Sequence, residues 1–242
     1  MKIFIDPGHG GMDSGAVGNG LLEKDIALDI SLKQKILFEK LGHIVKISRT
    51  TDKYVDLSVR TTEANNWGAD IFISNHINAG GGVGEEVWCS IYGGKGREYA
   101  TKVEKELSTL FKSRGVKTKR GSDGDYFYVI RETIMPAILN EIGFIDNTED
   151  AAKLKKEDIR QRCAEAVVMS ICGKLPEEQF KPIPLRTNYK VAAINIVSGK
   201  LNIVKTFEKD AYVTASKEDG EFYGLDINGV MGWIPKESTR LR

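Results

Sequence analysis

The sequence predicts an α/β fold, with a mostly parallel, twisted sheet flanked by helices, followed by a second, small all-β barrel domain. Strand-like and helix-like segments alternate through residues 1–173, which is typical of a parallel sheet. The stretch 174–188 holds three of the six prolines and is typical of an extended linker. Beyond it, only short strand-like runs remain, separated by turn dipeptides.

In the first part, β-branched and aromatic runs predict strands, and apolar residues recurring every three to four positions predict helices. The first strand, KIFID, stops at Pro7, and the first helix ends at Gly42, a favourable C-cap. The run 70–76 is almost continuously apolar, as expected of a strand covered on both faces. The predicted strands are 2–6, 43–48, 70–76, 85–92, 126–130 and 136–144, and the predicted helices are 23–41, 59–67, 97–115, 148–156 and 159–172.

Beyond the linker, the turn dipeptides SG, KD and NG and the tripeptide EDG separate five strand-like runs. This spacing predicts a small all-β barrel. The runs are KVAAINIV, KLNIVKTF, AYVTASKE, FYGLDI and VMGWIP. The sequence therefore divides into a domain over 1–175, a linker over 176–188 and a β domain over 189–242.

Composition excludes several classes of protein. The 242 residues carry a formal net charge of +1, so no global field favours nucleic acid as a partner. No apolar run approaches the roughly 20 residues that a membrane helix needs, so membrane insertion is not expected. The N-terminus has no signal-peptide pattern, and we expect synthesis in the cytoplasm. Cys89, Cys163 and Cys172 form no CxxC pair, which favours reduced thiols.

Two of the three histidines follow directly on predicted strands. His9 follows KIFID and His76 ends DIFISNH, so both are expected at the carboxyl edge of the sheet, where ligands bind in open α/β folds. Glu23 begins the helix just after the loop that carries His9. Two imidazoles and one carboxylate are the protein ligands of a catalytic zinc site. His43, which begins a strand after a helix, is expected to be structural or simply exposed.

Other interpretations of these residues stay open at this point. Glu23 is favoured in a first helical turn by the helix dipole alone, and His9 could simply be a hydrogen-bonded turn residue. The five glycines among residues 8–18 could form an anion-binding loop, although such a loop usually has a helix N-terminus immediately behind it and here LLEK intervenes. Alternatively, the glycines let the backbone pass close to a metal and a substrate.

Glu141 adds a carboxylate at the end of the apolar strand PAILNEIGF. Such a carboxylate is desolvated, and its pKa should rise toward the range of a general base. The alternative is a buried ion pair with an Arg or Lys. If Glu141 faces the same edge, a metal-activated water and a carboxylate base would form a hydrolase site. The helical HExxH motif is absent.

The blocks IDPGHGGMDSGAVG, LLEKDIALDI, SNHINA and MPAILNEIGFIDN, in this order, resemble those of the zinc-dependent N-acetylmuramoyl-L-alanine amidases of the amidase-3 family. The resemblance spans residues 2–173. It implies that His9, Glu23 and His76 bind Zn²⁺ and that Glu141 is the catalytic base. It also implies peptidoglycan as the substrate, cleaved at the amide between N-acetylmuramic acid and L-alanine.

The segment 189–242 distantly resembles a bacterial SH3-type cell-wall-binding module, through LNIV and NGVMGWIP. The arginine and the SGPS turn usual in that module are missing. Trp233, Tyr223, Tyr212 and Phe222 could form a surface that stacks on sugars or peptides, or could equally be core residues.

The leading hypothesis is a phage endolysin that reaches the cell wall through a holin, with a bacterial autolysin or spore-mother-cell lysin as the variant. A first rival is a zinc peptidase that cuts a bond within the stem peptide. A second is a non-catalytic wall-binding protein, against which the desolvated Glu141 argues.

Overall fold

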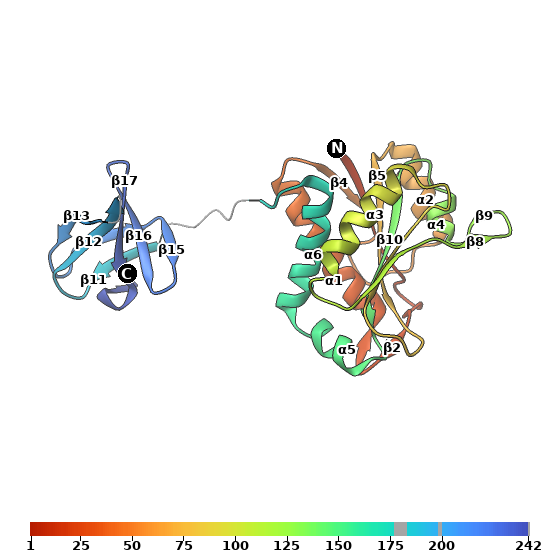
Figure 1. Ribbon diagram of the computed structural model, residues 1–242, viewed down its shortest axis with the longest axis horizontal. Helices are drawn as coiled ribbons and strands as arrows, with labels where there is room; N and C mark the ends of the chain where they lie inside the picture. Colours follow the sequence, from red (N-terminus) through yellow and green to blue (C-terminus); the bar gives the residue numbers. More distant parts are fainter. Residues whose placement is uncertain (177–182, 198–199, 242) are drawn as a thin grey trace. The chain divides into compact units, whose positions relative to one another are not determined.

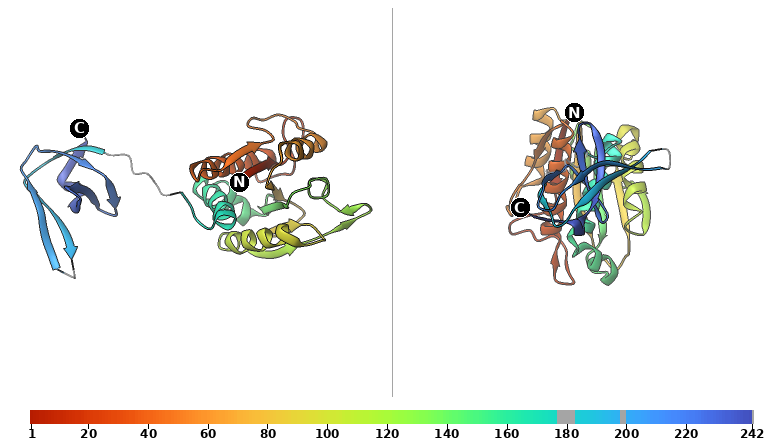
Figure 2. Two further views of the ribbon diagram at one scale, coloured as in Figure 1. Left: turned by 90° about the horizontal axis from the view of Figure 1, so that it is seen from above. Right: turned by 90° about the vertical axis from the view of Figure 1, so that its left-hand side faces the viewer.

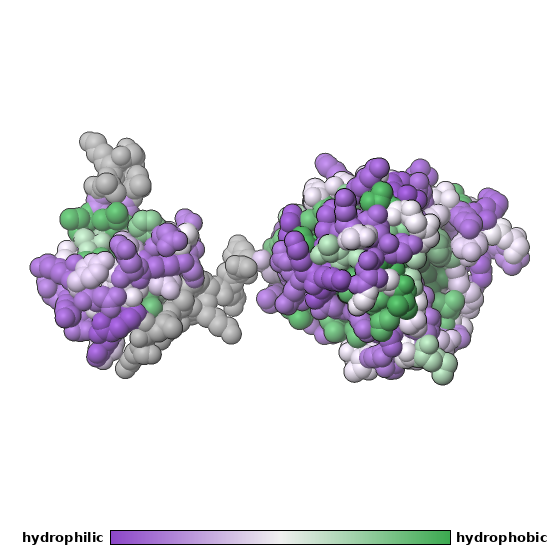
Figure 3. All heavy atoms as spheres, turned by 90° about the horizontal axis from the view of Figure 1, so that it is seen from below, coloured by the Kyte–Doolittle hydropathy of each residue, from purple (hydrophilic) through white to green (hydrophobic). Residues whose placement is uncertain are grey.

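The computed structural model describes residues 1–176, 183–197 and 200–241. The chain divides into two compact units, Met1–Pro176 and Glu177–Arg242. Figure 3 shows a largely hydrophilic surface with smaller apolar areas on the face in view. Within the described residues, no helix is both long enough and apolar enough to cross a bilayer.

A six-stranded sheet with the order β4-β1-β5-β10-β6-β7 forms the centre of the first unit (Figure 1). Neighbouring strands are parallel except β10 and β6, so β6 and β7 run opposite to the other four. The α/β prediction is confirmed. The strands are β1 (Lys2–Pro7), β4 (Ile44–Ile47), β5 (Ile71–Asn78), β6 (Glu85–Cys89), β7 (Ser113–Lys117) and β10 (Ala137–Phe144).

Helices cover both faces of this sheet. The helices are α1 (Glu23–Lys40), α2 (Leu57–Trp67), α3 (Gly94–Leu107), α4 (Tyr128–Arg131), α5 (Thr148–Leu154) and α6 (Glu157–Cys172). Two short ladders lie in the loops, β2 (Val17–Gly18) with β3 (Leu21–Leu22), and β8 (Arg120–Gly121) with β9 (Gly124–Asp125).

Alternate residues of the central strands enter two separate cores, because successive side chains of a strand point to opposite faces. Ile3, Ile71 and Ile138 join the larger core, to which α1, α3 and α6 contribute. Phe4 and Phe72, whose rings stack with centroids 5.5 Å apart, join the smaller core with residues of α2 and α4. The sheet is thus apolar on both faces, as the nearly unbroken apolar run 70–76 predicts.

A buried amide cluster fixes the register of the two strands at the centre of the sheet. Asn75 Oδ1 accepts hydrogen bonds from Asn140 Nδ2 at 3.0 Å and from Gln34 Nε2 at 3.1 Å. Asn75 Nδ2 donates to Ser31 Oγ at 2.9 Å. Since Asn75 and Asn140 are paired in the sheet, the next residues along, His76 and Glu141, lie side by side.

Two predicted elements of this unit are wrong. The strand expected over 126–130 is replaced by α4, because β10 already has β5 and β6 as neighbours and Val129 and Ile130 pack into the smaller core instead. The helix expected over 97–115 ends at Leu107. Hydroxyls of the next two residues, Ser108 and Thr109, bond to carbonyls of the last turn and compete with helical hydrogen bonds.

The second unit is all-β. Its described strands form a three-stranded sheet, β14-β11-β18, and a five-stranded sheet, β13-β12-β17-β16-β15. Antiparallel β12 and β13 form a long ladder (Figure 2). The strands are β11 (Ile183–Thr187), β12 (Val191–Val197), β13 (Lys200–Phe207), β14 (Tyr212–Ala215), β15 (Lys217–Asp219), β16 (Phe222–Ile227), β17 (Val230–Pro235) and β18 (Thr239–Leu241). The SH3-type identity of this unit stays a prediction.

β11 lies within the stretch 176–188 predicted as a linker. β11 pairs with both β14 and β18, and Pro184 is tolerated because pairing with β18 begins only at Leu185. Residues 177–182 of the predicted linker lie outside the described residues.

The loop after β1 is held by Arg60, a buried arginine of α2 that is 2% exposed. Its Nη1 donates to Asp6 Oδ1 at 2.7 Å and to the carbonyl of Pro7 at 2.6 Å, and its Nη2 donates to the carbonyl of His9 at 2.9 Å. Where the chain leaves a sheet, its buried carbonyl groups need other hydrogen-bond donors, and the Arg60 guanidinium supplies them.

A second buried arginine, Arg49, holds the same loop from the β4 side. It is 1% exposed, and its Nη2 donates to the carbonyls of Gly8 and Lys24, both at 2.7 Å. Its Nε donates to the carbonyl of Pro7 at 3.2 Å. Arg49 therefore ties the loop after β1 to the first turn of α1.

Replacing Arg60 with Met should strongly destabilise the first unit, because it leaves the Asp6 carboxylate, 1% exposed, without its cation. We expect the free energy of unfolding to fall by about 3–5 kcal/mol. Urea denaturation followed by tryptophan fluorescence measures the change. As a control, Lys35→Met, which removes the exposed pair with Glu39, should cost about 0.5 kcal/mol or less. A loss for Arg60→Met as small as that of the control would contradict this role.

Candidate metal centre

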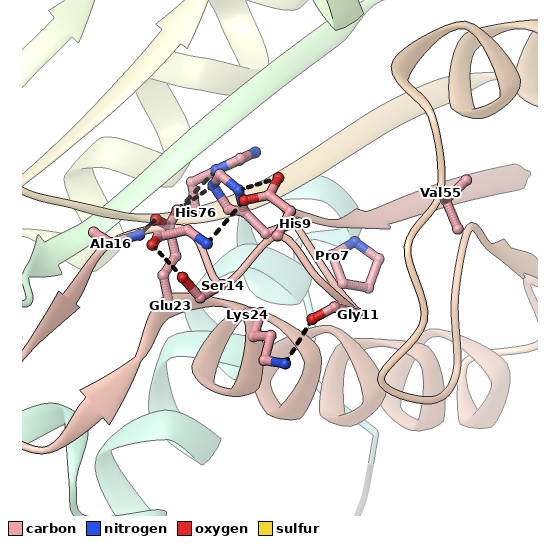
Figure 4. A network of polar contacts seen from close by, with 12 residues as sticks. Pro7, His9, Gly11, Ser14, Ala16, Glu23, Lys24, Val55 and His76 are labelled. Carbon is pink, nitrogen blue, oxygen red and sulfur yellow. Dashed lines mark hydrogen bonds and ion pairs between the residues drawn. The ribbon is translucent and has the colours of Figure 1, made fainter.

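His9, Glu23 and His76 come together at the carboxyl edge of the sheet (Figure 4). His9 lies in the loop after β1, Glu23 is the first residue of α1, and His76 lies on β5. Glu23 Oε1 is 3.1 Å from His9 Nε2 and 2.9 Å from His76 Nδ1. One potential ligand atom from each residue lies within 4.8 Å of the other two. The predicted convergence of these side chains is therefore present.

Backbone donors fix the Glu23 carboxylate between the two histidines. Its Oε1 also accepts from the Ile77 amide at 3.0 Å, and its Oε2 accepts from the Ala16 amide at 2.8 Å. Burial alone would raise the pKa of Glu23, but the hydrogen bonds from His76 and His9 outweigh it and hold that pKa well below its ordinary range.

The same contacts act on the imidazoles in the opposite sense. Burial opposes a charge on His9, yet the hydrogen bonds to Glu23 and Asp13 raise its pKa to about 9. Burial likewise opposes a charge on His76, and Glu23 again raises its pKa. The three side chains therefore hold a proton tightly between them, and a metal ion that bound here would have to replace it.

Asp13 orients His9, and the sequence prediction missed it. Asp13 Oδ2 lies 2.8 Å from His9 Nδ1, and its Oδ1 accepts from the Gly15 amide at 3.0 Å. A histidine that binds metal through one nitrogen commonly hydrogen-bonds a carboxylate through the other. A carboxylate four residues after a histidine in the same glycine-rich loop is the signal that could have identified it.

Two glycines of this loop are required by close packing. A Cβ at Gly8 would lie 2.4 Å from His76 Cε1, and a Cβ at Gly15 would lie 2.6 Å from Glu23 Oε2. Gly15 also has a φ of 63°. The anion-loop interpretation is disfavoured, because α1 begins with two acids, Glu23 and Asp25.

Glu141 lies on β10 directly beside His76. Its Oε2 is buried and has no hydrogen-bond partner among the described residues, so the alternative of an Arg or Lys partner finds no support there. Burial raises the pKa of Glu141 to about 7, although the neighbouring His76 opposes the shift. A carboxyl group with this pKa can both accept and donate a proton near neutral pH.

A cleft of about 310 Å³ leads to the two histidines from the face covered by α2 and α4. Apolar and aromatic side chains line most of it, with the imidazoles of His9 and His76 among the polar groups. The other lining residues include Tyr54, Val55, Leu57, Phe127, Tyr128, Val129 and Leu139. A mostly apolar cleft with a few convergent polar groups is the usual form of a substrate site.

The third histidine lies apart from this centre. His43 Nδ1 is 3.3 Å from the amino terminus, and its Nε2 is 3.2 Å from Cys172 Sγ. All three cysteines are free thiols; Cys89 and Cys163 are buried and Cys172 is half-buried.

The aromatic residues singled out in the second unit do not form one surface. Trp233 and Phe222 line a cleft of about 490 Å³ together with Ile194, Asn195, Asp219 and Met231. Tyr223 points to the other face of β16 and packs against the core. Tyr212 is 57% exposed on β14, with the Arg186 guanidinium 4.3 Å from its ring centroid.

Comparison with known proteins shows which family this chain is similar to. Residues 3–173 match the family described as N-acetylmuramoyl-L-alanine amidase. The amidase CwlM of Bacillus licheniformis is 47% identical over 171 residues, which cover 68% of this chain and 64% of CwlM. The endolysin of Bacillus phage SPP1 is 35% identical over 209 residues, covering 80% of this chain and 76% of that protein.

Comparison with solved structures gives the same family. The catalytic domain of CwlV, an N-acetylmuramoyl-L-alanine amidase of Bacillus (Paenibacillus) polymyxa, superposes with a TM-score of 0.65 at 31% identity, covering 71% of this chain and 96% of that one. The matched region spans less than two thirds of CwlM. Since the family match covers residues 3–173 of 242, the chain belongs to the N-acetylmuramoyl-L-alanine amidase family.

Proposed function

We propose that this protein is a peptidoglycan hydrolase that cleaves the amide between N-acetylmuramic acid and the L-alanine of the stem peptide. One observation carries the proposal: two histidines and a carboxylate gather at a single point, and Glu141, whose buried Oε2 has no hydrogen-bond partner among the described residues, lies beside them. The family membership and the names of the relatives support the choice of substrate.

We infer that the resident metal is zinc, held by His9, Glu23 and His76. Two imidazole nitrogens and one carboxylate oxygen suit zinc and leave a coordination position open. Asp13 supports this assignment, because it fixes the ring of His9 through the nitrogen that faces away from Glu23. When bound, zinc would acidify a water molecule and polarise the scissile carbonyl.

The protein's own groups supply the rest of the reaction. Glu141 takes a proton from the attacking water and delivers it to the nitrogen of the leaving alanine, a role suited to its raised pKa. The cleft that leads to the two histidines past α2 and α4 positions the substrate against the sheet edge. Proton transfer is needed because an unactivated amide has a poor leaving group.

The test is digestion of purified peptidoglycan by the full chain, with and without a chelator. Release of N-terminal alanine together with free lactyl ends, abolished by the chelator, is the expected result. New amino termini other than alanine would instead indicate a peptidase that cuts within the stem peptide. Binding without any new termini would indicate a wall-binding protein.

We further propose that the second unit binds the cell wall through the cleft lined by Trp233 and Phe222, since aromatic rings stack well on sugars. Trp233→Ala should lower the fraction of protein that sediments with cell walls, while hydrolysis of soluble muramoyl peptides is unchanged. Equal sedimentation of the variant and the wild type would refute this assignment.

An endolysin role is favoured over an autolysin role by the match to the SPP1 endolysin, which extends over 80% of this chain. In that role the protein would reach the wall after release through a holin. Expression in a bacterial host should then cause lysis only when a holin is expressed with it. Lysis without a holin would favour the autolysin role.

Replacing Glu141 with Ala should abolish proton transfer but leave the metal ligands in place. We expect kcat to fall by at least about 100-fold, the low end of general-base contributions, with bound zinc unchanged. Hydrolysis of a soluble muramoyl peptide and metal analysis measure the two effects. Glu39→Ala, on the exposed face of α1, is the matched control and should behave as wild type. Unchanged turnover in Glu141→Ala would remove Glu141 from the reaction.

Replacing His76 with Ala should remove one metal ligand. We expect zinc affinity to fall by at least about 10-fold, because one of three protein ligands is lost. Competition with a chromophoric chelator measures it, and His43→Ala is the control that should retain full affinity. Full zinc occupancy in His76→Ala under the same competition would contradict the ligand assignment.

A further inference from the structure

The polar row that contains His76 and Glu141 continues across two more strands of the sheet. Glu141 on β10 pairs with His76 on one side and with Glu86 of β6 on the other. Between the pairs Glu85–Ser113 and Val87–Val116, the register of β6 and β7 shifts, so that Arg114 and Gly115 together oppose Glu86. His76, Glu141, Glu86 and Arg114 thus follow one another on four adjacent strands.

Glu86 is the fixed member of this row. It is 6% exposed, and its Oε2 accepts from Arg114 Nε at 2.8 Å. Its Oε1 accepts from Asn78 Nδ2 at 3.1 Å and from Trp88 Nε1 at 3.2 Å. With three donors on its two oxygens, Glu86 is an anchor for Arg114 rather than a second free acid beside Glu141.

The hydrogen bond to Glu86 orients Arg114 but engages only part of its guanidinium group. The Glu86 carboxylate engages only its Nε, and the centroid of the buried Phe144 ring lies 4.9 Å from its Cζ. The side chain is 38% exposed, and within the described residues no hydrogen bond to either terminal nitrogen is found. A guanidinium held at Nε and on one face presents its two terminal nitrogens as a fork suited to a carboxylate.

We propose that Arg114 binds a carboxylate on the peptide side of the scissile amide, at the second residue of the stem peptide. This inference rests on the proposed function. Neighbouring strands lie about 4.8 Å apart, so the backbone of Arg114, two strands away, is roughly 10 Å from that of Glu141, and the Arg114 side chain reaches back toward Glu86. An extended peptide advances about 3.3–3.6 Å per residue, which brings the residue after the leaving alanine within reach of the fork. Arg114 thereby distinguishes a free carboxylate from a carboxamide at that residue.

The test compares two soluble N-acetylmuramoyl tripeptides that differ only at the second residue, with a free α-carboxylate in one and a carboxamide in the other. The zinc-loaded full chain should prefer the carboxylate by at least about 10-fold in kcat/KM, mostly through KM, as expected for a charge-assisted hydrogen bond. Arg114→Gln should lose this preference by losing activity on the carboxylate substrate alone. Arg114→Lys should retain part of it, as a single point charge.

Arg240→Gln is the matched control, because it removes another arginine paired with a carboxylate, in the second unit. It should keep the wild-type preference. Equal kcat/KM of the wild type on the two tripeptides would refute the role proposed for Arg114 but would leave the proposed function standing. An equal loss on both substrates in Arg114→Gln, with no recovery in Arg114→Lys, would show a merely structural role. If the wild type cleaves neither tripeptide, the proposed function fails and this inference fails with it.

Discussion

The carboxyl edge of the sheet depends on the buried guanidinium groups of Arg49 and Arg60. They hold the carbonyls of the loop after β1. Where this loop leaves the sheet, the carbonyls of Pro7, Gly8 and His9 point inward and accept from Arg49 and Arg60. His9 adopts a positive φ of 58°, a conformation that few side chains tolerate without support. The hydrogen bonds from Arg49 and Arg60 to the loop carbonyls provide that support, and they thereby fix the direction of the His9 imidazole.

Charged groups lie along the carboxyl edge of the sheet as well as beneath the loop after β1. Glu23, ionised between two imidazoles, attracts a cation to one end of the row, and Arg114 provides a fixed positive group at the other. Glu141 lies between them, and its buried Oε2 has no hydrogen-bond partner in the part of the chain that the structure describes. A substrate with an amide at the metal end and an anionic group further along matches this distribution of charge. Under the proposed function, the sheet edge would supply the reacting groups and would also set the direction in which the peptide lies.

The parts of the site that the sequence revealed are those determined by strand ends. His9 and His76 follow apolar strands, and the ends of parallel neighbours meet at one edge, so their proximity was predictable. Asp13 and Arg114 were not, because a loop conformation and a bulge decide where they point. The aromatic run 126–130 has strand propensity but forms α4, since both neighbours of β10 are already in place. Propensity could not foresee that competition.

The position of β10 has a consequence for how the protein matures. β5 and β6 are consecutive in the chain, yet β10, whose last residue is Phe144, lies between them. β5 can pair with β1 and β6 with β7 beforehand, but β5 and β6 must not stay paired with each other if β10 is to enter between them. Glu141 lies on that late strand, so a nascent chain that ends before β10 carries His9, Glu23 and His76 without the proton-transfer group proposed above. Under the proposed mechanism, hydrolysis can therefore begin only after β10 has been inserted into the sheet.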